Sequence, residues 1–296
     1  MCRGSLAAKA QAWKACGALP HGSSNLPLGV TGITMIPKAL VLTGYGINCD
    51  METRHAFELA GAMADRVHIN DLINDKERLY DYHILAFPGG FSFGDDIASG
   101  KVLANMIKYN IGEQIQEFID EGKLIIGICN GFQAMVKMGL LPGFNGNYAA
   151  REVTLTFNDS GRFEDRWVHL KANKISKCVF TEGIESIYLP VRHGEGKFVT
   201  KNPQVLEKLK KRNHIVFQYT DTEGRTAGYP HNPNGSVYNI AAICDETGRV
   251  FGMMPHPEAF QHMTNHPRWT REELPEEGAG VAIFRNAVDY VKKNFS

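Results

Sequence analysis

The sequence predicts an α/β fold, with a doubly wound, mostly parallel sheet and additional strands in the C-terminal part of the chain. Short apolar runs alternate with segments of helical spacing in the first half, and glycine or proline ends several of the runs. These runs are almost continuously apolar, as expected for strands that helices cover on both faces. The chain has 296 residues and no internal repeat, and we expect a single domain with extra strands rather than two independent domains.

The first half supplies four strands with helices between them. The strand-like runs are residues 39–43, 66–69, 83–87 and 124–128. Helical spacing appears at residues 50–60, 98–121 and 131–138. The third run stops at Pro88-Gly89-Gly90, a typical turn sequence.

After Gly143 the pattern changes to mixed polar and apolar residues with several strand-like pieces. These pieces lie at residues 153–157, 187–191, 214–220, 237–244 and 249–254. Glycine and proline residues between positions 224 and 235 indicate turns. The segment 280–295 has apolar residues on one helical face and predicts a closing helix.

The composition excludes several function classes. Lys plus Arg and Asp plus Glu each number 32, so no net charge would draw the chain to nucleic acid or to an anionic membrane. No apolar run approaches the roughly 20 residues that span a bilayer. The six cysteines are scattered without a CxxC pair, which argues against a zinc site or a disulfide framework. We therefore expect no metal site, no nucleic-acid or membrane partner, and a cytoplasmic location.

The N-terminal stretch differs from the rest of the chain. The first 49 residues contain no Asp or Glu, while Arg3, Lys9, Lys14 and Lys38 are basic. An organelle transit peptide would be basic and poor in acids, but one arginine and three spaced lysines are a weak signal. We interpret residues 1–36 as a disordered or spurious extension and residues 37–296 as the folded domain.

The strongest local motif is Gly127-Ile128-Cys129-Asn130-Gly131, between a buried strand and a helix. This is the strand-to-helix elbow of Ser hydrolases with Cys in place of Ser. Glycines permit the sharp turn, and the N-terminus of the helix favours a thiolate. The N–H of Asn130 would point toward an oxyanion. The alternative is a small buried cysteine at a tight turn, which this motif alone leaves open.

A nucleophilic cysteine needs a base, and the base needs an orienting group. His256-Pro257-Glu258 follows the apolar run 250–254. Residues two apart on an extended segment point the same way, so His256 and Glu258 could face one cleft. The chain has eleven histidines, and a histidine without a catalytic role remains the alternative.

In combination, Gly-x-Cys-x-Gly-x-Gln and the later His-Pro-Glu resemble the class I glutamine amidotransferases, which have a Cys-His-Glu triad and a flavodoxin-like sheet. The resemblance implies that Gln133 holds the amide end of glutamine and that Gly90 and Asn130 donate to the oxyanion. It also implies that the main chain of His193-Gly194-Glu195 holds the glutamine backbone. The alternative for Gln133 is a glutamine on the helix surface. For Gly90 it is a plain Gly-Gly turn, and for residues 193–195 it is a tight turn before a strand.

Further segments resemble one branch, the glutaminase components of phosphoribosylformylglycinamidine synthase. They are residues 48–53, 88–95, 127–133, 160–167, 193–198, 232–236 and 253–258. The resemblance implies that the chain hydrolyses glutamine and delivers ammonia to a synthase (PurL-type) subunit, with a small PurS-type subunit, in purine biosynthesis. It implies no cofactor in this chain, with ATP and Mg on the synthase, in keeping with the absence of a G-x-x-x-x-G-K-[ST] loop.

Two other functions stay open. One is a glutaminase that serves another synthase, with the same triad. The other is a peptidase or chaperone with a cysteine elbow, a group that takes its histidine from next to the cysteine, where this chain has Asn130. Outside the triad, we expect Cys49 to be structural. Arg162 and Arg166 either contact a partner or pair with the neighbouring acids.

Overall fold

The computed structural model describes residues 35–295. Most of the extension expected at residues 1–36 lies outside the described residues. A nine-stranded sheet runs in the order β2-β1-β3-β4-β11-β10-β9-β6-β7, and β5 and β8 form a separate two-stranded sheet. The predicted α/β class is confirmed, and the C-terminal strands extend the same sheet.

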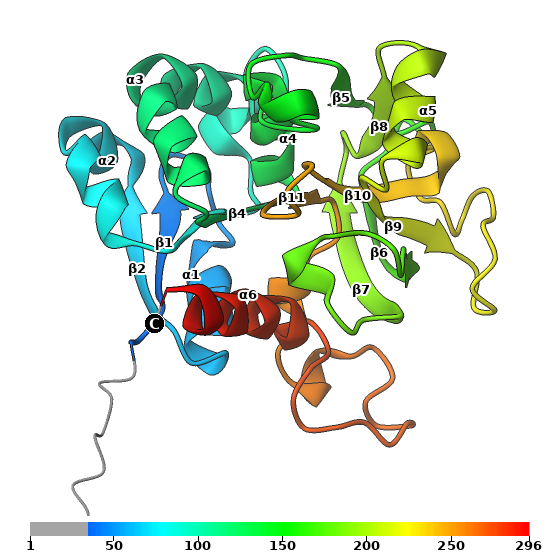
Figure 1. The fold of residues 1–296 in the computed structure, drawn as a ribbon. Coiled ribbons are helices and arrows are strands. Elements are labelled where there is room, and N and C mark those ends of the chain that lie inside the picture. Colours follow the sequence, from blue (N-terminus) through cyan, green and yellow to red (C-terminus); the bar gives the residue numbers. More distant parts are fainter. Residues whose placement is uncertain (1–34, 296) are drawn as a thin grey trace, which may run out of the picture. The chain divides into compact units, whose positions relative to one another are not determined.

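The first five strands in that order are parallel and carry helices on both faces. They are β2 (Met63–His68), β1 (Lys38–Thr43), β3 (Ile84–Phe87), β4 (Leu124–Ile128) and β11 (Val250–Met253). On one face lie α1 (Asp50–Leu59) and α6 (Val281–Asn294), and on the other lie α3 (Lys101–Asp120) and α4 (Asn130–Met138) (Figure 1). A short helix, α2 (Ile69–Asn74), follows β2. Every residue of β3, β4 and β11 is buried, which explains their apolar sequences.

The remaining four strands of the large sheet are antiparallel. They are β10 (Ile240–Cys244), β9 (Ile215–Thr220), β6 (Glu164–Ala172) and β7 (Ser186–His193). The small sheet pairs β5 (Val153–Thr156) with β8 (Lys197–Thr200), and α5 (Pro203–Lys211) follows β8. The strand expected over 237–244 is shorter than predicted, because residues Val237–Asn239 form a 3₁₀ turn.

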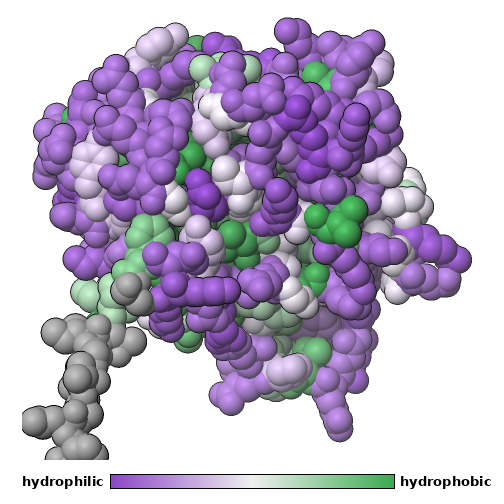
Figure 2. All heavy atoms as spheres, in the orientation of Figure 1, coloured by the Kyte–Doolittle hydropathy of each residue, from purple (hydrophilic) through white to green (hydrophobic). Residues whose placement is uncertain are grey.

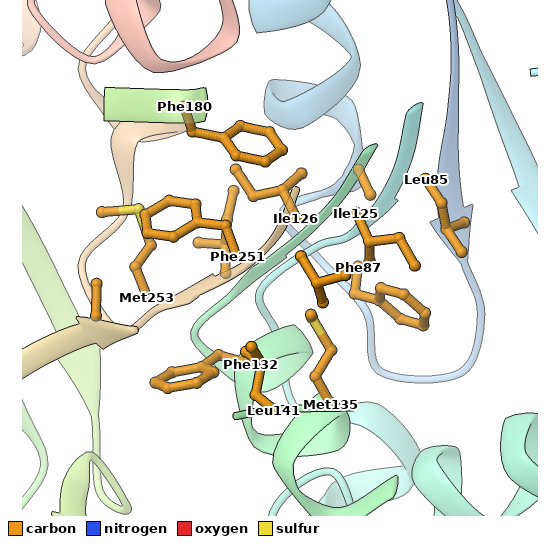
Figure 3. Close-up of a cluster of buried hydrophobic side chains, with 14 of the residues drawn as sticks. Leu85, Phe87, Ile125, Ile126, Phe132, Met135, Leu141, Phe180, Phe251 and Met253 are labelled. Carbon is orange, nitrogen blue, oxygen red and sulfur yellow. The ribbon is translucent and has the colours of Figure 1, made fainter. Parts of the chain in front are cut away.

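The core beneath the elbow fixes the position of α4 on the sheet. Side chains from β3, β4 and β11 meet Phe132 and Met135 of α4 (Figure 3). Three glycines allow this approach: a Cβ on Gly127 would collide with Met135, one on Gly252 with Phe132, and one on Gly131 with the backbone of β3. The N-terminus of α4 is therefore pressed onto the carboxyl ends of the central strands, and Cys129 immediately precedes it.

The surface is mainly hydrophilic on the face drawn in Figure 2, with hydrophobic residues in small groups. No helix among residues 35–295 is long and apolar enough to cross a membrane.

Candidate active site

Cys129 occupies the turn between β4 and α4 in a strained backbone conformation. Its φ is +50° and its ψ is −105°, outside the regions that non-glycine residues normally adopt. Its N–H donates to the carbonyl of Met253 on β11 over 2.8 Å, and its side chain is 4% exposed. The cysteine elbow predicted from the sequence is present, held by the glycine contacts of α4.

His256 and Glu258 form a buried hydrogen-bonded pair. The Nδ1 atom of His256 lies 2.5 Å from Oε1 of Glu258, and each residue is 2% exposed. The prediction that His256 and Glu258 lie on an extended segment is wrong. Residues Pro257–Ala259 form a 3₁₀ turn, which brings the Glu258 carboxylate back to the His256 ring. The His256 N–H donates to the carbonyl of Pro190 over 2.8 Å, which ties this turn to β7.

Strand register brings the cysteine and the histidine together. In the parallel pair β4–β11, Ile128 is opposite Met253, so the residues that follow each strand leave the sheet at the same edge. Within the described chain, His256 Nε2 makes no hydrogen bond of standard geometry. Burial opposes a charge on the ring, but Glu258 and the Cys129 thiol outweigh burial and hold the pKa of His256 well above its usual value. The ring is therefore set to carry a proton beside the nucleophile.

Gly90 and Asn130 offer two backbone N–H groups next to the elbow. Gly90 has a φ of +147°, and a Cβ there would lie 2.6 Å from the carbonyl oxygen of Gly46. The neighbouring Phe91 N–H donates to that same oxygen over 2.7 Å. For residues 35–295, no acceptor is found for the N–H of Gly90 or of Asn130, the first residue of α4. Both groups remain free for a ligand, and their oxyanion role stays a prediction.

The loop that follows Gly90 contains several strained residues. Phe93, Asp95 and Ile97 have φ values of 54°, 56° and 70° although none is glycine. Ile97 is 87% exposed, so packing does not explain its conformation. Three such residues in one short loop concentrate backbone strain beside the elbow.

The buried side chain of Asn130 links this loop to the elbow. Its Oδ1 accepts from the N–H of Ser92 over 3.2 Å, and its Nδ2 donates to Asp95 over 3.1 Å. Burial raises the pKa of the Asp95 carboxyl, and nearby Glu195 adds to the effect. The motif predicts a role only for the main chain of Asn130, because it gives no information about side-chain hydrogen bonds across a cleft.

Gln133 is buried rather than on the surface of its helix. It is 3% exposed, its Nε2 donates to the carbonyl of Glu195 over 2.7 Å, and its Oε1 accepts from Asn130 over 3.0 Å. The alternative of a surface glutamine is wrong. Gln133 therefore joins α4 to the segment 193–196, and its contact with substrate remains a prediction.

The His193 ring is bound within a network of buried amides. Its Nδ1 lies 3.1 Å from Oδ1 of Asn158, and its Nε2 lies 3.4 Å from Nδ2 of Asn234. Because an amide oxygen only accepts and an amide nitrogen only donates, Nδ1 carries the proton of a neutral ring. Burial, and then the charge on His256, lower the pKa of His193 to about 3. A ring that stays neutral and has both nitrogens bonded to amides is poorly suited to act as a base, and the binding of substrate by the main chain of residues 193–195 stays a prediction.

The amide network extends over two loops that the motif analysis did not identify as a site. Ser236 Oγ donates to Asn234 over 2.6 Å and accepts from the N–H of Phe198 over 2.9 Å. Asn158 Nδ2 donates to the carbonyl of His193 over 2.8 Å, and its Oδ1 accepts from Gly196 N–H over 3.0 Å. The Asn-Pro-Asn-Gly-Ser sequence at 232–236 was visible, but its partners are distant in the chain.

The other singled-out residues have local roles. Arg166 pairs with Glu164 and donates to the Tyr229 hydroxyl over 2.9 Å, which agrees with the neighbouring-acid alternative. The carbonyl of Arg162 accepts from Asn158. Cys49, which was expected to be structural, is a free thiol whose Sγ lies 4.0 Å from His256 Nδ1, beside the triad.

Comparisons with known proteins show the family of the chain. A family model for the CobB/CobQ-like glutamine amidotransferase domain matches residues 36–291. Phosphoribosylformylglycinamidine synthase subunit PurQ of Dehalococcoides mccartyi is 52% identical over 257 residues, covering 86% of this chain and 98% of the relative. The subunit of the same name from Methanococcus maripaludis strain C5 is 49% identical, covering 88% and 100%.

Two solved structures resemble the chain. A chain in the structure of PurLQS from Thermotoga maritima matches with a TM-score of 0.64 and 30% identity, over 87% of this chain and 100% of that one. A putative GMP synthase protein from Thermoplasma acidophilum matches with a TM-score of 0.51 and 12% identity, over 88% and 96%. The second match is a likeness of fold alone.

Proposed function

The chain belongs to the CobB/CobQ-like glutamine amidotransferase family, in the branch of the phosphoribosylformylglycinamidine synthase subunits PurQ, and we propose that it is the glutaminase subunit of such a synthase. It hydrolyses glutamine to glutamate and delivers the ammonia to a synthase subunit in de novo purine biosynthesis. The observation that carries this proposal is the strained Cys129 elbow facing the buried His256–Glu258 pair.

In the first half of the reaction, the Cys129 thiolate attacks the carboxamide carbon of glutamine, and the carbonyl electrons move onto its oxygen. The N–H groups of Gly90 and Asn130 stabilise this oxyanion, and one such donor contributes about 10²–10³ in rate. The raised pKa of His256 keeps a proton on the ring, and His256 gives it to the leaving nitrogen. The C–N bond breaks, ammonia leaves, and a thioester on Cys129 remains.

In the second half, water hydrolyses the thioester. His256, now neutral, takes a proton from water as the oxygen attacks the thioester carbon. Glu258 keeps Nδ1 protonated, so the free lone pair is on Nε2, the atom without another hydrogen-bond partner in the described chain. The C–S bond breaks, glutamate leaves, and the proton returns the cysteine and histidine to their starting state. No step requires a metal or an organic cofactor of this chain.

The partners are a PurL-type synthase and a small PurS-type protein, in keeping with the similar chain in the PurLQS structure. ATP and Mg bind on the synthase, since this sequence has no phosphate-binding G-x-x-x-x-G-K-[ST] loop. The cytoplasm is the proposed location, because the cysteines among residues 35–295 are all free thiols.

The strained loop after Gly90 supports control of this site by the synthase. A partner that fixes the loop would set the direction of the Gly90 N–H, and the isolated chain would be slow. We expect the synthase with its nucleotide ligands to raise glutaminase kcat by at least about tenfold.

The test is glutamate release by the full chain, alone and titrated with the synthase and the small PurS-type protein, together with formation of the amidine product. Activation by this synthase and not by others would support the proposal. A lone chain that already works at the rate of the complex would contradict partner control. Activation by a different amidotransferase synthase would assign the glutaminase to that pathway instead.

A further inference from the structure

Cys49 lies beside the triad, and the proposed reaction gives it no role. It immediately precedes α1, and its N–H donates to the carbonyl of Gly89 over 3.2 Å. The hydroxyl of Thr53 donates to the carbonyl of Cys49 over 2.6 Å. Both bonds hold the backbone of Cys49 in place, and its thiol lies between Asn48 Oδ1, 3.4 Å away, and His256 Nδ1, 4.0 Å away.

Three different donor atoms meet at this point. A sulfur of Cys49, a ring nitrogen of His256 and a carboxylate oxygen of Glu258 all lie within 4.8 Å of one another. The Cys49 Sγ is 4.0 Å from His256 Nδ1, and that nitrogen is 2.5 Å from Glu258 Oε1. Thiolate, imidazole and carboxylate are the donors that zinc binds in proteins.

The separations are close to those of a tetrahedral site. Ligand bonds of about 2.0–2.3 Å place donor atoms about 3.3–3.6 Å apart. The sulfur–nitrogen distance would shorten and the nitrogen–oxygen distance would lengthen, each by less than about 1 Å. Gly89 closes the other side, because a Cβ there would lie 2.7 Å from the His256 ring and 3.3 Å from Cys49 Sγ.

A second observation points to a ligand here. Within residues 35–295, Glu258 Oε2 is buried and has no hydrogen-bond partner, although Glu258 is only 2% exposed. A buried carboxylate oxygen without a donor is unusual in a folded protein, and a cation next to the carboxylate would satisfy it.

We propose that Cys49, His256 and Glu258 form an inhibitory binding site for a thiophilic divalent cation such as Zn²⁺. Water fills the fourth position. The inhibition rests on the proposed glutaminase function, whereas binding of the cation does not.

Binding stops the reaction through the histidine. The Cys49 thiol and the Nδ1–H of His256 each lose a proton to solvent, and the cation binds the sulfur and the Nδ1 lone pair, so that the one proton left on the ring lies on Nε2. A ring bound to the cation through Nδ1 and protonated on Nε2 has no free lone pair. His256 then cannot take a proton from water, and so it cannot cycle between its protonated and neutral forms during turnover. The cation also separates Nδ1 from Glu258, which removes the bond that orients the ring.

Binding is tested first without reference to activity. The full chain carries Cys2→Ala, Cys16→Ala and Cys129→Ala, which remove the N-terminal thiols and the competing nucleophile. Titration with Co²⁺, a coloured substitute for Zn²⁺, should give a thiolate-to-cobalt charge-transfer band that saturates at one ion per chain. Adding Cys49→Ala should abolish the band, while adding Cys178→Ala, a buried thiol elsewhere, should leave it. A band that survives Cys49→Ala, or no band in the starting variant, would overturn the proposal.

Inhibition is then tested with Cys129 present, in the chain that carries only Cys2→Ala and Cys16→Ala. Zn²⁺ should inhibit glutamate release by the complex, and a chelator should restore it. Because loss of a ligand should weaken binding at least as much as loss of an outer-shell contact, Cys49→Ala should raise the inhibitory Zn²⁺ concentration by about tenfold or more. In the absence of Zn²⁺, the glutaminase activity of the Cys49→Ala complex should equal that of the complex with Cys49.

Equal sensitivity of the two proteins would show that Cys49 does not bind the inhibitory ion and would overturn the proposal. A complex without any glutaminase activity would contradict the proposed function, and the cobalt spectrum would still decide the metal site.

Discussion

His256 and His193 are both only 2% exposed, yet their surroundings act on them in opposite ways. His256 has a carboxylate on Nδ1 and a thiol nearby, and its pKa lies well above the usual value. His193 has only amide groups on its nitrogens, and burial lowers its pKa to about 3. Burial is common to the two rings, so the charge of the partners decides the difference.

The two histidines belong to regions with different roles. The triad region moves protons, whereas the amide network around His193 supports the main chain of residues 193–196. The amide network around His193 contacts the main chain at His193 and Gly196, and Gln133 contacts that of Glu195. A neutral ring with a fixed tautomer suits this role, because its hydrogen bonds do not change over the working pH range. The triad region needs the reverse property, a ring whose proton can leave and return.

The largest difference between the two regions should appear with Cys129→Ala. Glutamine-dependent activity of the assembled synthase should fall to background, because no nucleophile remains, while activity with ammonium salts should persist. The measurement is amidine formation with each nitrogen donor. Equal loss with both donors would show that the ammonia-using reaction also depends on this region.

Glu258→Gln should reduce glutamine-dependent kcat by about 10²–10⁴, since a neutral amide does not stabilise the imidazolium and its NH₂ group can favour the other tautomer of the ring. Removal of the carboxylate should also lower the pKa of His256. The ring titration followed by NMR in wild type and variant checks the shift. An unchanged His256 titration would mean that Glu258 does not raise this pKa.

A change in the amide network should affect stability and substrate binding more than chemistry. Asn234→Ala leaves Nε2 of His193 without its donor and should lower the free energy of unfolding by about 1–3 kcal/mol. The KM for glutamine should rise with little change in kcat, because the segment 193–196 loses part of its support. The exposed Asn110→Ala on α3 is the control and should change stability by less than about 0.5 kcal/mol. A pure loss of kcat would instead give the network a catalytic role.

The smallest effect concerns pH. His193 has a pKa of about 3 in the folded chain and about 6.5 when unfolded. Its neutral form therefore contributes stability that is fully present above about pH 6.5 and is lost as the pH falls toward 3. His193→Gln, which does not titrate, should lose stability less steeply over this range. Titration of His256 does not contribute to the pH dependence of stability in this range, because its raised pKa changes the free energy of unfolding only above about pH 6.5. Parallel curves for the two proteins would contradict the buried neutral ring.

The sequence predicted the parallel part of the fold well and the antiparallel part less completely. The run at β3 is apolar throughout, the run at β4 contains only apolar residues and a glycine, and β1 is apolar at its four buried central residues, because both faces are covered, so these strands were easy to identify. Helix α5 was missed, although Asn202 caps it and Pro203 occupies its first turn. Its short length and five charged or amide side chains among nine residues concealed the apolar face.

For the site, the elbow and the His-Pro-Glu turn could be identified because each lies within a few residues. The partners of His193 could not, since Asn158 and Asn234 are 35 and 41 positions away. The predicted reason for the His256–Glu258 contact was wrong, because periodicity does not distinguish an extended segment from a single 3₁₀ turn that starts at proline.

The position of β11 has a consequence for synthesis of the protein. It is the last strand of the sheet along the chain, yet it lies between β4 and β10 and carries the turn that bears His256. Until residues 250–258 have left the ribosome, β4 has an unpaired edge, and Cys129 has neither its base nor the Met253 carbonyl that holds its N–H. A nascent or truncated chain therefore cannot release ammonia, and it exposes an apolar strand edge that favours aggregation and degradation. Activity therefore cannot begin before the sheet is complete.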